Sequence, residues 1–475
     1  MDSKISLKVA QDLFLPLRVT LPVTSLGVFM GALDGSITNV SLVTIQKALS
    51  TDITGIRWIV IVYLLVISAA MGLAGTLGDN YGRRRIFTIG LAIFVGGSFF
   101  CAFSSTLELL ILSRIIQALG AAGMSANGLA ILMFYTDPHH RGRAIGINSV
   151  VVASALTSGP VLGGILTQFL GWPVIFLINI PIGILAIFTT YRLIPETPKR
   201  VDTKLDYLGA LLFAVIAFSF VGGILFFFQG NVGALSLVLL AVGASIVFVY
   251  QENRHPNPVL SINLLKNRKI ATGLMSALFC YMAVNGTFFL LPFFYQEILT
   301  FTQSETGILL IVSPLVMAAS GPITGLMAEK IEARKLATAG ALLQGFFIII
   351  LATINPQMSL ITIVILVGLS AGSLAIFTNS NGTSVMNATP KANMSTISGM
   401  LNLSRTLGFS LATGLSSAFF ELFLTIYDPN GAVSGLEFEL AYYQSLGITF
   451  TILALFAFVG MMISFMRGRR DVKES

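Results

Sequence analysis

Three charged side chains lie inside long apolar stretches of this sequence: Asp34, Arg114 and Arg405. A charge in such surroundings is costly unless it is paired, hydrated or neutralised by a proton. Burial favours the neutral form of a carboxyl group, so Asp34 is suited to take up and release a proton. The alternative for Asp34 is a structural hydrogen bond. For Arg405 two interpretations stay open: it attracts a polar or anionic ligand, or it braces a neighbouring helix through backbone carbonyls.

A glycine-rich segment with one acid and a run of arginines occupies 75–85, as Gly-Thr-Leu-Gly-Asp-Asn-Tyr-Gly-Arg-Arg-Arg. Glycines let two helix ends approach closely and turn sharply. The acid beside the arginines can form charge-assisted hydrogen bonds to a neighbouring helix end. The segment therefore predicts a tight turn with a latch, made by Gly78, Asp79, Gly82, Arg83 and Arg84. An anchor made only of positive charges is the alternative, but it does not need the Gly-Asp spacing.

A second small-residue motif, Ser-Gly-Pro-Val-Leu-Gly-Gly, occupies 158–164 inside another apolar stretch. A proline within a helix bends it, and glycines on one face allow tight contact with a neighbouring helix. We therefore expect a close helix contact shaped by Gly159, Pro160, Gly163 and Gly164.

The elements that must position these residues are transmembrane helices. Hydrophobic residues form 55% of the 475-residue chain and charged residues only 10%, whereas a soluble domain carries about 25% charged residues. The composition therefore excludes a water-soluble protein. About 20 apolar residues cross a bilayer as a helix. Cutting the chain at charge clusters and turn residues predicts fourteen such segments, at 17–46, 56–77, 86–104, 107–134, 143–168, 173–193, 205–228, 233–250, 269–298, 304–328, 334–354, 358–384, 393–423 and 442–466.

The basic residues predict the orientation in the membrane. An even number of spans places both termini on one side. Most of the 28 Lys and Arg residues fall in the tails and in the alternate loops that share this side, and the positive-inside rule assigns that side to the cytoplasm. Only Lys47 and Arg57 are expected on the outer side. The net charge of +7 therefore reflects orientation and indicates no nucleic-acid partner.

A faint internal repeat predicts the domain organisation. The 75–85 segment is echoed at 325–335, and a shorter match shares the same offset of 250 residues. Such repeats are typical of transporters built from two related bundles, although chance is the alternative. We expect an N-terminal six-helix bundle, a lipid-facing linker hairpin of two helices, and a C-terminal six-helix bundle with a tail, over 1–204, 205–250 and 251–475 respectively.

On these motifs the chain resembles the major facilitator superfamily, and within it the fourteen-helix drug:proton antiporters of the EmrB/QacA type. The segment around Asp79 resembles the superfamily's cytoplasmic gating motif. The segment around Pro160 resembles the antiporter motif, with Ala155 where the family often has glycine. The stretches around Asp34 and Arg114 resemble motifs of the first and fourth helices. The resemblance covers nearly the whole chain.

The resemblance implies a protein that is not an enzyme: a proton-coupled antiporter for multidrug efflux, which exports small amphipathic or lipophilic compounds across the bacterial cytoplasmic membrane by alternating access. The alternatives are an exporter of a dedicated lipid or fatty-acid-like substrate and a proton-linked nutrient importer. The expected partners are the small-molecule substrate, protons and the lipid bilayer, for a monomer without an obvious adaptor protein.

The resemblance also implies proton coupling at Asp34, assisted by Arg114, with Glu421 in the thirteenth helix as a further candidate. Counting 1.5 Å per residue from the outer helix ends puts Asp34 about 20 Å deep and Arg114 about 9 Å deep. We therefore expect a direct pair only if the helices are offset, or if a water molecule lies between the two side chains.

Uncharged amides and aromatic side chains within the helices are candidates for the wall of a substrate cavity, because amides that face lipid are costly. Together with Arg405, these candidates are Asn39, Tyr63, Gln117, Asn285, Phe289 and Asn381. We expect no cofactor and no metal, because the sequence has no phosphate-binding loop and its three histidines lack the spacing of metal ligands.

Overall fold

The structure is a computed structural model that describes residues 17–137, 140–197, 206–228, 230–255, 262–328, 330–390, 393–428 and 435–467. Within these residues all regular structure is helical, and 14 helices are long and apolar enough to cross a membrane. The predicted class, an all-α membrane protein with fourteen spans, is thereby confirmed. Most of both tails, whose cytoplasmic location the sequence predicts, lies outside the described residues.

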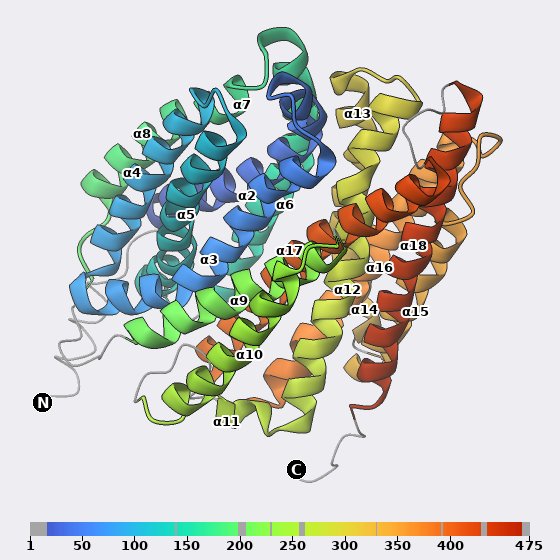
Figure 1. Cartoon of the computed structure of the whole chain (residues 1–475). Helices are drawn as coiled ribbons and strands as arrows, with labels where there is room; N and C mark the ends of the chain where they lie inside the picture. The colour runs from blue at the N-terminus through green and yellow to red at the C-terminus, as the bar shows by residue number, and fades with distance from the viewer. Residues whose placement is uncertain are drawn as a thin grey trace, which may run out of the picture. The chain divides into compact units, whose positions relative to one another are not determined.

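The helices follow one another along the chain with short connections (Figure 1). They are α2 (Leu17–Ala48), α3 (Ile53–Tyr81), α4 (Arg83–Ala102), α5 (Leu107–Tyr135), α6 (Arg141–Leu170), α7 (Val174–Leu177), α8 (Asn179–Leu193), α9 (Tyr207–Phe228), α10 (Gly233–Glu252), α11 (Ile262–Leu265), α12 (Arg268–Phe293), the π-helical turn η2 (Phe294–Ile298), α13 (Gln303–Leu310), α14 (Val312–Ala328), α15 (Ala333–Leu351), α16 (Leu360–Asn387), α17 (Met394–Tyr427) and α18 (Leu436–Phe465).

The largest difference from the predicted span boundaries is at the start of the last span. The last span begins at Leu436 instead of 442, and its first turn contains Glu437 and Glu439. Carboxylates at this end interact favourably with the exposed N–H groups and the helix dipole. Cutting the chain at charges assigned these acids to a loop, whereas the helix uses them in its first turn.

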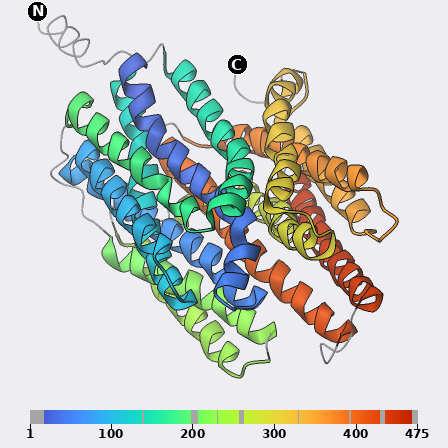
Figure 2. The same cartoon turned by 90° about the horizontal axis from the view of Figure 1, so that it is seen from above.

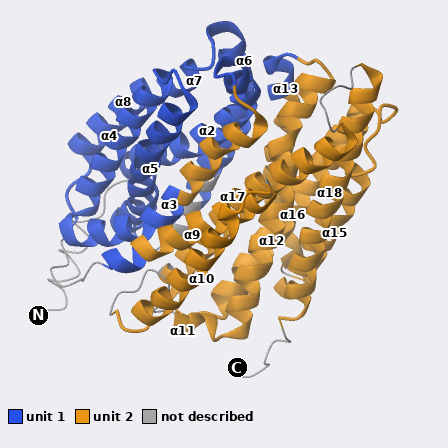
Figure 3. Cartoon of the chain, in the orientation of Figure 1, with its two compact units in different colours: residues 1–50, 66–210, 302–307 blue, residues 51–65, 211–301, 308–475 orange. Residues whose placement is uncertain are grey.

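The chain forms two compact units, coloured separately in Figure 3. Unit 1 comprises 1–50, 66–210 and 302–307, and unit 2 comprises 51–65, 211–301 and 308–475. The first part of α3 therefore belongs to unit 2 and the rest of this helix to unit 1. The division into two six-helix bundles and a hairpin stays a prediction.

Within unit 1, α2 lies along α6 and α4 lies along α5 (Figure 2). Glycines allow this close approach. A Cβ atom added to Gly90 of α4 would lie 2.9 Å from the carbonyl oxygen of Gly120 on α5, and one added to Gly97 would lie 2.5 Å from the backbone nitrogen of Gln117. The α4–α5 contact therefore runs backbone against backbone, and it sets the position of the polar residues on α5.

Within unit 2, α12 packs against α17 and α18, and α15 packs against α16 and α18. The segment predicted to be a linker hairpin contains α9 and α10. Phe228 of α9 contacts Phe419 of α17, with ring centroids 4.8 Å apart. By contrast, α10 exposes a row of large apolar side chains, among them Leu235, Leu239 and Ile246. Such a face suits contact with lipid rather than with water.

Candidate functional site: a buried carboxylate in unit 1

Asp34 lies in the middle of α2 and is completely buried. Its two carboxylate oxygens accept three hydrogen bonds from two other spans. Arg114 donates from Nη1 to Oδ2 over 2.7 Å, Gln117 donates from Nε2 to Oδ1 over 2.8 Å, and Asn179 donates from Nδ2 to Oδ1 over 3.2 Å. The resemblance-based pairing of Asp34 with Arg114 is therefore present as a direct, buried ion pair.

The helices around Asp34 hold its partners in place. Arg114 and Gln117 are three residues apart on α5, so their side chains share one face of the helix. Gln117 Oε1 also accepts from Arg114 Nη1 over 2.5 Å. Ser98 of α4 accepts from Gln117 and Asn179 over 2.8 and 3.3 Å. The ring of Phe176 on α7 lies 5.6 Å from the guanidinium carbon of Arg114, close enough for a cation–π interaction.

The sequence left open whether Asp34 and Arg114 pair directly or through a bridging water, and the 2.7 Å contact is direct. Counting residues from the helix ends treated α2 and α5 as starting at one level, and it neglected the length of the arginine side chain. In the structure the two charged groups are in direct contact, without a bridging water.

The contacts around Asp34 suit its ionised form. A carboxylate accepts hydrogen bonds only, and here each donor aimed at it comes from a cation or an amide. A proton on the carboxyl group would remove the negative charge that Arg114 balances. It would also place an O–H donor next to three groups that are themselves donors.

The predicted gating segment lies at the α3–α4 connection of unit 1. Arg83 binds Asp79 through two nitrogens, at 2.6 and 2.9 Å. Gly82 connects the two helices with φ of +103°, a left-handed conformation that favours glycine. The predicted latch to another helix end is made by Arg84, which donates to Glu196 over 3.3 Å and to the carbonyl oxygen of Ile194 over 3.0 Å.

Two further contacts tighten this connection. The backbone N–H of Arg83 donates to Thr197 Oγ1 over 2.9 Å. Gly78 packs against Asn127 of α5 so closely that any side chain at position 78 would clash with it. Asn127 in turn donates to the carbonyl oxygen of Ala74 over 3.0 Å. The charged contacts are partly exposed, so their contribution to stability is modest.

The predicted small-residue contact on α6 is present. A Cβ atom added to Gly163 would lie 2.7 Å from the carbonyl oxygen of Ile37 on α2, and one added to Gly159 would clash with Ser36. A Cβ atom added to Gly164 would likewise clash with the backbone of Gln303, and one added to Gly307 would clash with the backbone of Pro160. These glycines therefore fix α6 against the helix that carries Asp34.

Glu421 of α17 lies in unit 2 together with the first turns of α3. Thr54 donates from Oγ1 to Glu421, with both carboxylate oxygens 2.5 Å away. Arg57, which the sequence assigns to the outer side of the membrane, is completely buried in the protein. Its Nη1 donates to Ser417 of α17 over 3.0 Å. A second group of acidic, basic and hydroxyl side chains thus forms here.

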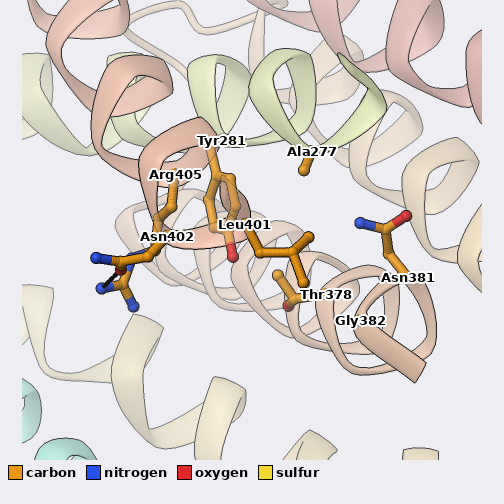
Figure 4. Close-up of a pocket in the computed structure, with 8 residues that line it drawn as sticks. All are labelled: Ala277, Tyr281, Thr378, Asn381, Gly382, Leu401, Asn402 and Arg405. Atoms are coloured by element: carbon orange, nitrogen blue, oxygen red, sulfur yellow. Dashed lines mark hydrogen bonds between the residues drawn. The ribbon is translucent and has the colours of Figure 1, made fainter. Parts of the chain in front are cut away.

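The predicted cavity residues take different positions. Asn381 and Arg405 line a cavity of about 210 Å³ in unit 2 (Figure 4). Gln117 belongs to the Asp34 cluster. Asn285 is partly buried and donates to the carbonyl oxygen of Phe409 over 3.1 Å. The other candidates are buried in the protein, namely Asn39, Tyr63 and Phe289.

Sequence reasoning missed several partners of these sites. Asn179 follows a Gly-Trp-Pro turn and precedes Pro181, a local pattern that carries no signal of a partner for Asp34. Ser98 lies in an apolar helix without any local signal. Glu196 lies about 110 residues along the chain from the arginine that it binds. Each acts through a contact between distant segments, which spacing along the chain does not predict. Among the described residues, no group of three or more His, Cys, Asp or Glu side chains could hold a metal ion.

Comparisons with known proteins identify the family. A family model described as the Major Facilitator Superfamily matches residues 24–413. The riboflavin transporter of Clostridioides difficile is 33% identical over 94% of this chain and 97% of its own length. The multidrug resistance protein Stp of Mycobacterium tuberculosis is 31% identical, over 83% of this chain and 74% of its own.

A solved structure supports the fold. A bacterial homologue of the human lysosomal transporter Spinster, in an inward-facing and occupied conformation, matches with a TM-score of 0.71. The alignment covers 94% of this chain and 96% of that chain, at 17% identity.

Proposed function

Because the chain belongs to the Major Facilitator Superfamily, we propose that it is a proton-coupled antiporter that exports small amphipathic or lipophilic compounds across the bacterial cytoplasmic membrane by alternating access. Multi-pass insertion and transport of small molecules follow from the 14 candidate spans and from the family. Efflux is supported by the relatives named as multidrug and methylenomycin A resistance proteins.

The observation that carries proton coupling is the buried Asp34 carboxylate with its three donors. In the ionised state each donor has an acceptor. When a proton binds to Asp34, the negative charge that balances Arg114 is lost. The carboxyl group then carries an O–H donor of its own among the amide groups that donate to it. In the proposed cycle, Asp34 takes a proton from outside while substrate is released there. It gives the proton to the cytoplasm when the next substrate binds.

The other motifs support the change between states. We assign the gating role to the Asp79 segment, because Arg84 ties the start of α4 to the segment that follows α8. The glycines around Pro160 hold α6 against α2, so a rearrangement at Asp34 is transmitted to α6. Two six-helix bundles with a hairpin between them, cytoplasmic termini and a monomer without an adaptor complete the proposal.

Glu421 is the second candidate for proton coupling. Its carboxylate accepts from Thr54, and the buried Arg57 lies on the same pair of helices. The Glu421 carboxylate accepts from one hydroxyl group, whereas that of Asp34 accepts from an arginine and two amides. Fewer hydrogen bonds therefore tie the Glu421 site to the positions of its helices.

Proton movement in liposomes tests the proposal. The purified protein is reconstituted, a proton gradient is imposed, and lumen pH is followed while ethidium, tetracycline, a fluoroquinolone, riboflavin or a lysophospholipid is added. We expect substrate-dependent proton movement in the wild type. In Asp34→Asn we expect it to fall to the level of empty liposomes, because an amide carries no exchangeable charge.

Asp52→Asn is the matched control. Asp52 is exposed and caps α3 through the N–H of Gly55, and asparagine caps a helix equally well. Proton movement that survives Asp34→Asn would contradict the assignment, and its loss in Glu421→Gln alone would transfer coupling to Glu421. Absence of substrate-dependent proton movement with every compound would reject multidrug antiport.

The riboflavin transporter relative favours a second candidate, a carrier for a flavin-like compound. Proton movement with riboflavin but with none of the drugs would select this candidate. The direction of substrate movement relative to protons separates export by antiport from uptake. A response confined to the lysophospholipid would select the lipid-like substrate.

A further inference from the structure

A cavity of about 210 Å³ lies within unit 2 between α12, α16 and α17. Its polar lining residues are Tyr281, Thr378, Asn381, Asn402 and Arg405. In Figure 4, Arg405 and Asn402 lie together on one side and Asn381 on the other, with Tyr281 and Leu401 between them. Pockets that enclose a whole drug-sized ligand measure about 300–1,000 Å³. This cavity therefore has room for one end of such a molecule.

The charge in the cavity lining is positive and has no balancing acid. Arg405 is the one charged residue among those that line the cavity. Its side chain is exposed and donates from Nη2 to Asn402 on its own helix over 2.5 Å. Across the described ranges of the chain, Arg405 forms no salt bridge and no hydrogen bond to a backbone carbonyl of another helix. The geometry therefore favours ligand attraction over bracing, the two interpretations that the sequence left open.

A second cation, Arg467, contacts the cavity-lining residue Asn381. Arg467, just past the end of α18, is 2% exposed and donates to Asn381 and to Ser276. Two of its nitrogens, Nε and Nη1, have no hydrogen-bond partner within the described part of the chain. Burial, followed by the nearby Arg334, lowers the pKa of the Arg467 guanidinium to about 10, so this group stays charged at pH 7.

Asn381 connects the cavity to Arg467, because it lines the cavity and binds this cation. Asn381 accepts from Arg467 through Oδ1 and donates to the carbonyl oxygen of Gly273 over 3.1 Å. The amide is thus held in one orientation, with a buried cation on its far side. A negative group in the cavity would experience both the charge of Arg405 and the positive potential of the buried Arg467.

We propose that this cavity binds the anionic end of the transported compound, a carboxylate, sulfonate or phosphate attached to an apolar body. The planar guanidinium of Arg405 matches the paired oxygens of such groups. Leu401 and the Tyr281 ring supply apolar contact for the adjoining part of the ligand. The inference rests on the proposed transport function for its meaning, but binding is measurable without transport.

Two fluorescent probes that share one aromatic framework test the proposal. 8-Anilinonaphthalene-1-sulfonate carries a sulfonate, and N-phenyl-1-naphthylamine lacks it. Each is titrated into the purified full chain in detergent at pH 7.5, with protein-free micelles subtracted. We expect saturable binding of the sulfonate with a Kd at least 10-fold below that of the neutral probe. In Arg405→Gln the sulfonate should weaken by about 10- to 100-fold, the range for a hydrogen bond to a charged group.

Three further variants make the result specific. Arg405→Lys keeps the charge but loses the planar fork, so we expect it to recover part of the sulfonate affinity. Arg268→Gln removes an exposed arginine at the start of α12 that does not line the cavity, and it should leave both Kd values unchanged. Asp34→Asn should keep sulfonate binding even where it abolishes proton movement, which separates failure of this inference from failure of the transport proposal.

Equal affinities for the two probes would overturn the proposal. The same holds if Arg405→Gln weakens both probes equally, or if Arg268→Gln weakens the sulfonate as much as Arg405→Gln does. A lack of saturable sulfonate binding to the wild type would overturn it as well. Thermal melting of each variant in the same detergent identifies any that fail to fold. If Arg405→Gln does not fold, Arg405→Lys decides, because affinity equal to the wild type would contradict a role for the planar fork.

Discussion

The buried carboxylate of Asp34 is held by polar side chains from α5 and α8. Asp34 receives Arg114, Gln117 and Asn179, and the two amides are in turn held by Ser98. Removing one member of a buried ion pair is costlier than removing both, because the remaining charge has no partner and little water. This asymmetry distinguishes a charge pair from a set of ordinary hydrogen bonds.

The asymmetry predicts the behaviour of a double variant. Arg114→Met leaves the Asp34 charge unbalanced, and we expect it to lower the free energy of unfolding by about 3–5 kcal/mol. Adding Asp34→Asn removes the remaining charge, so the double variant should regain a large part of that loss. SDS titration at pH 7.5 measures the free energy of unfolding of Arg114→Met, of Asp34→Asn, of the double variant and of the wild type. Additive losses in the double variant would contradict a direct charge pair.

At the scale of helices, glycine positions determine how closely polar residues are brought together. Gly97 of α4 touches the backbone of Gln117, whereas the adjacent Gly96 has nothing within 4 Å of a Cβ atom added to it. Neighbouring glycines in one helix thus have opposite roles. The sequence pattern alone treats them alike, since both are small residues in an apolar span.

This pair predicts a contrast between two single variants. Gly97→Ala forces α4 away from α5 and should cost about 1–3 kcal/mol, the usual range for an overpacked contact. Because the displaced backbone carries Gln117, proton coupling should also fall. Gly96→Ala points into open space and should be neutral or stabilising by up to about 1 kcal/mol, since alanine favours the helix. Thermal melting and the liposome assay on both variants test this, and equal effects of the two would refute it.

At the scale of the whole molecule, the sequence predicts the spans well because bilayer thickness sets the length of each apolar segment. Asp34 and Arg114 were also predicted, since charges inside apolar runs are conspicuous. The sequence left their direct contact open, because counting residues from the helix ends takes no account of helix tilt or of the length of the arginine side chain. The burial of Arg57 and its bond to Ser417 were likewise not predicted, because they depend on the packing of α3 against α17.

The predicted orientation is the last property to test, and it concerns the chain as a whole. Cysteine replaces Ser50, between α2 and α3, or Lys330, between α14 and α15; both residues are exposed. If the positive-inside rule holds, a membrane-impermeant maleimide should label Ser50→Cys only in right-side-out vesicles and Lys330→Cys only in inside-out vesicles. The unaltered chain is the control, because Cys101 and Cys280 are both buried. Labelling of both variants from the same side would exclude the predicted topology, because the nine candidate spans between Ser50 and Lys330 require the two positions to lie on opposite sides of the membrane.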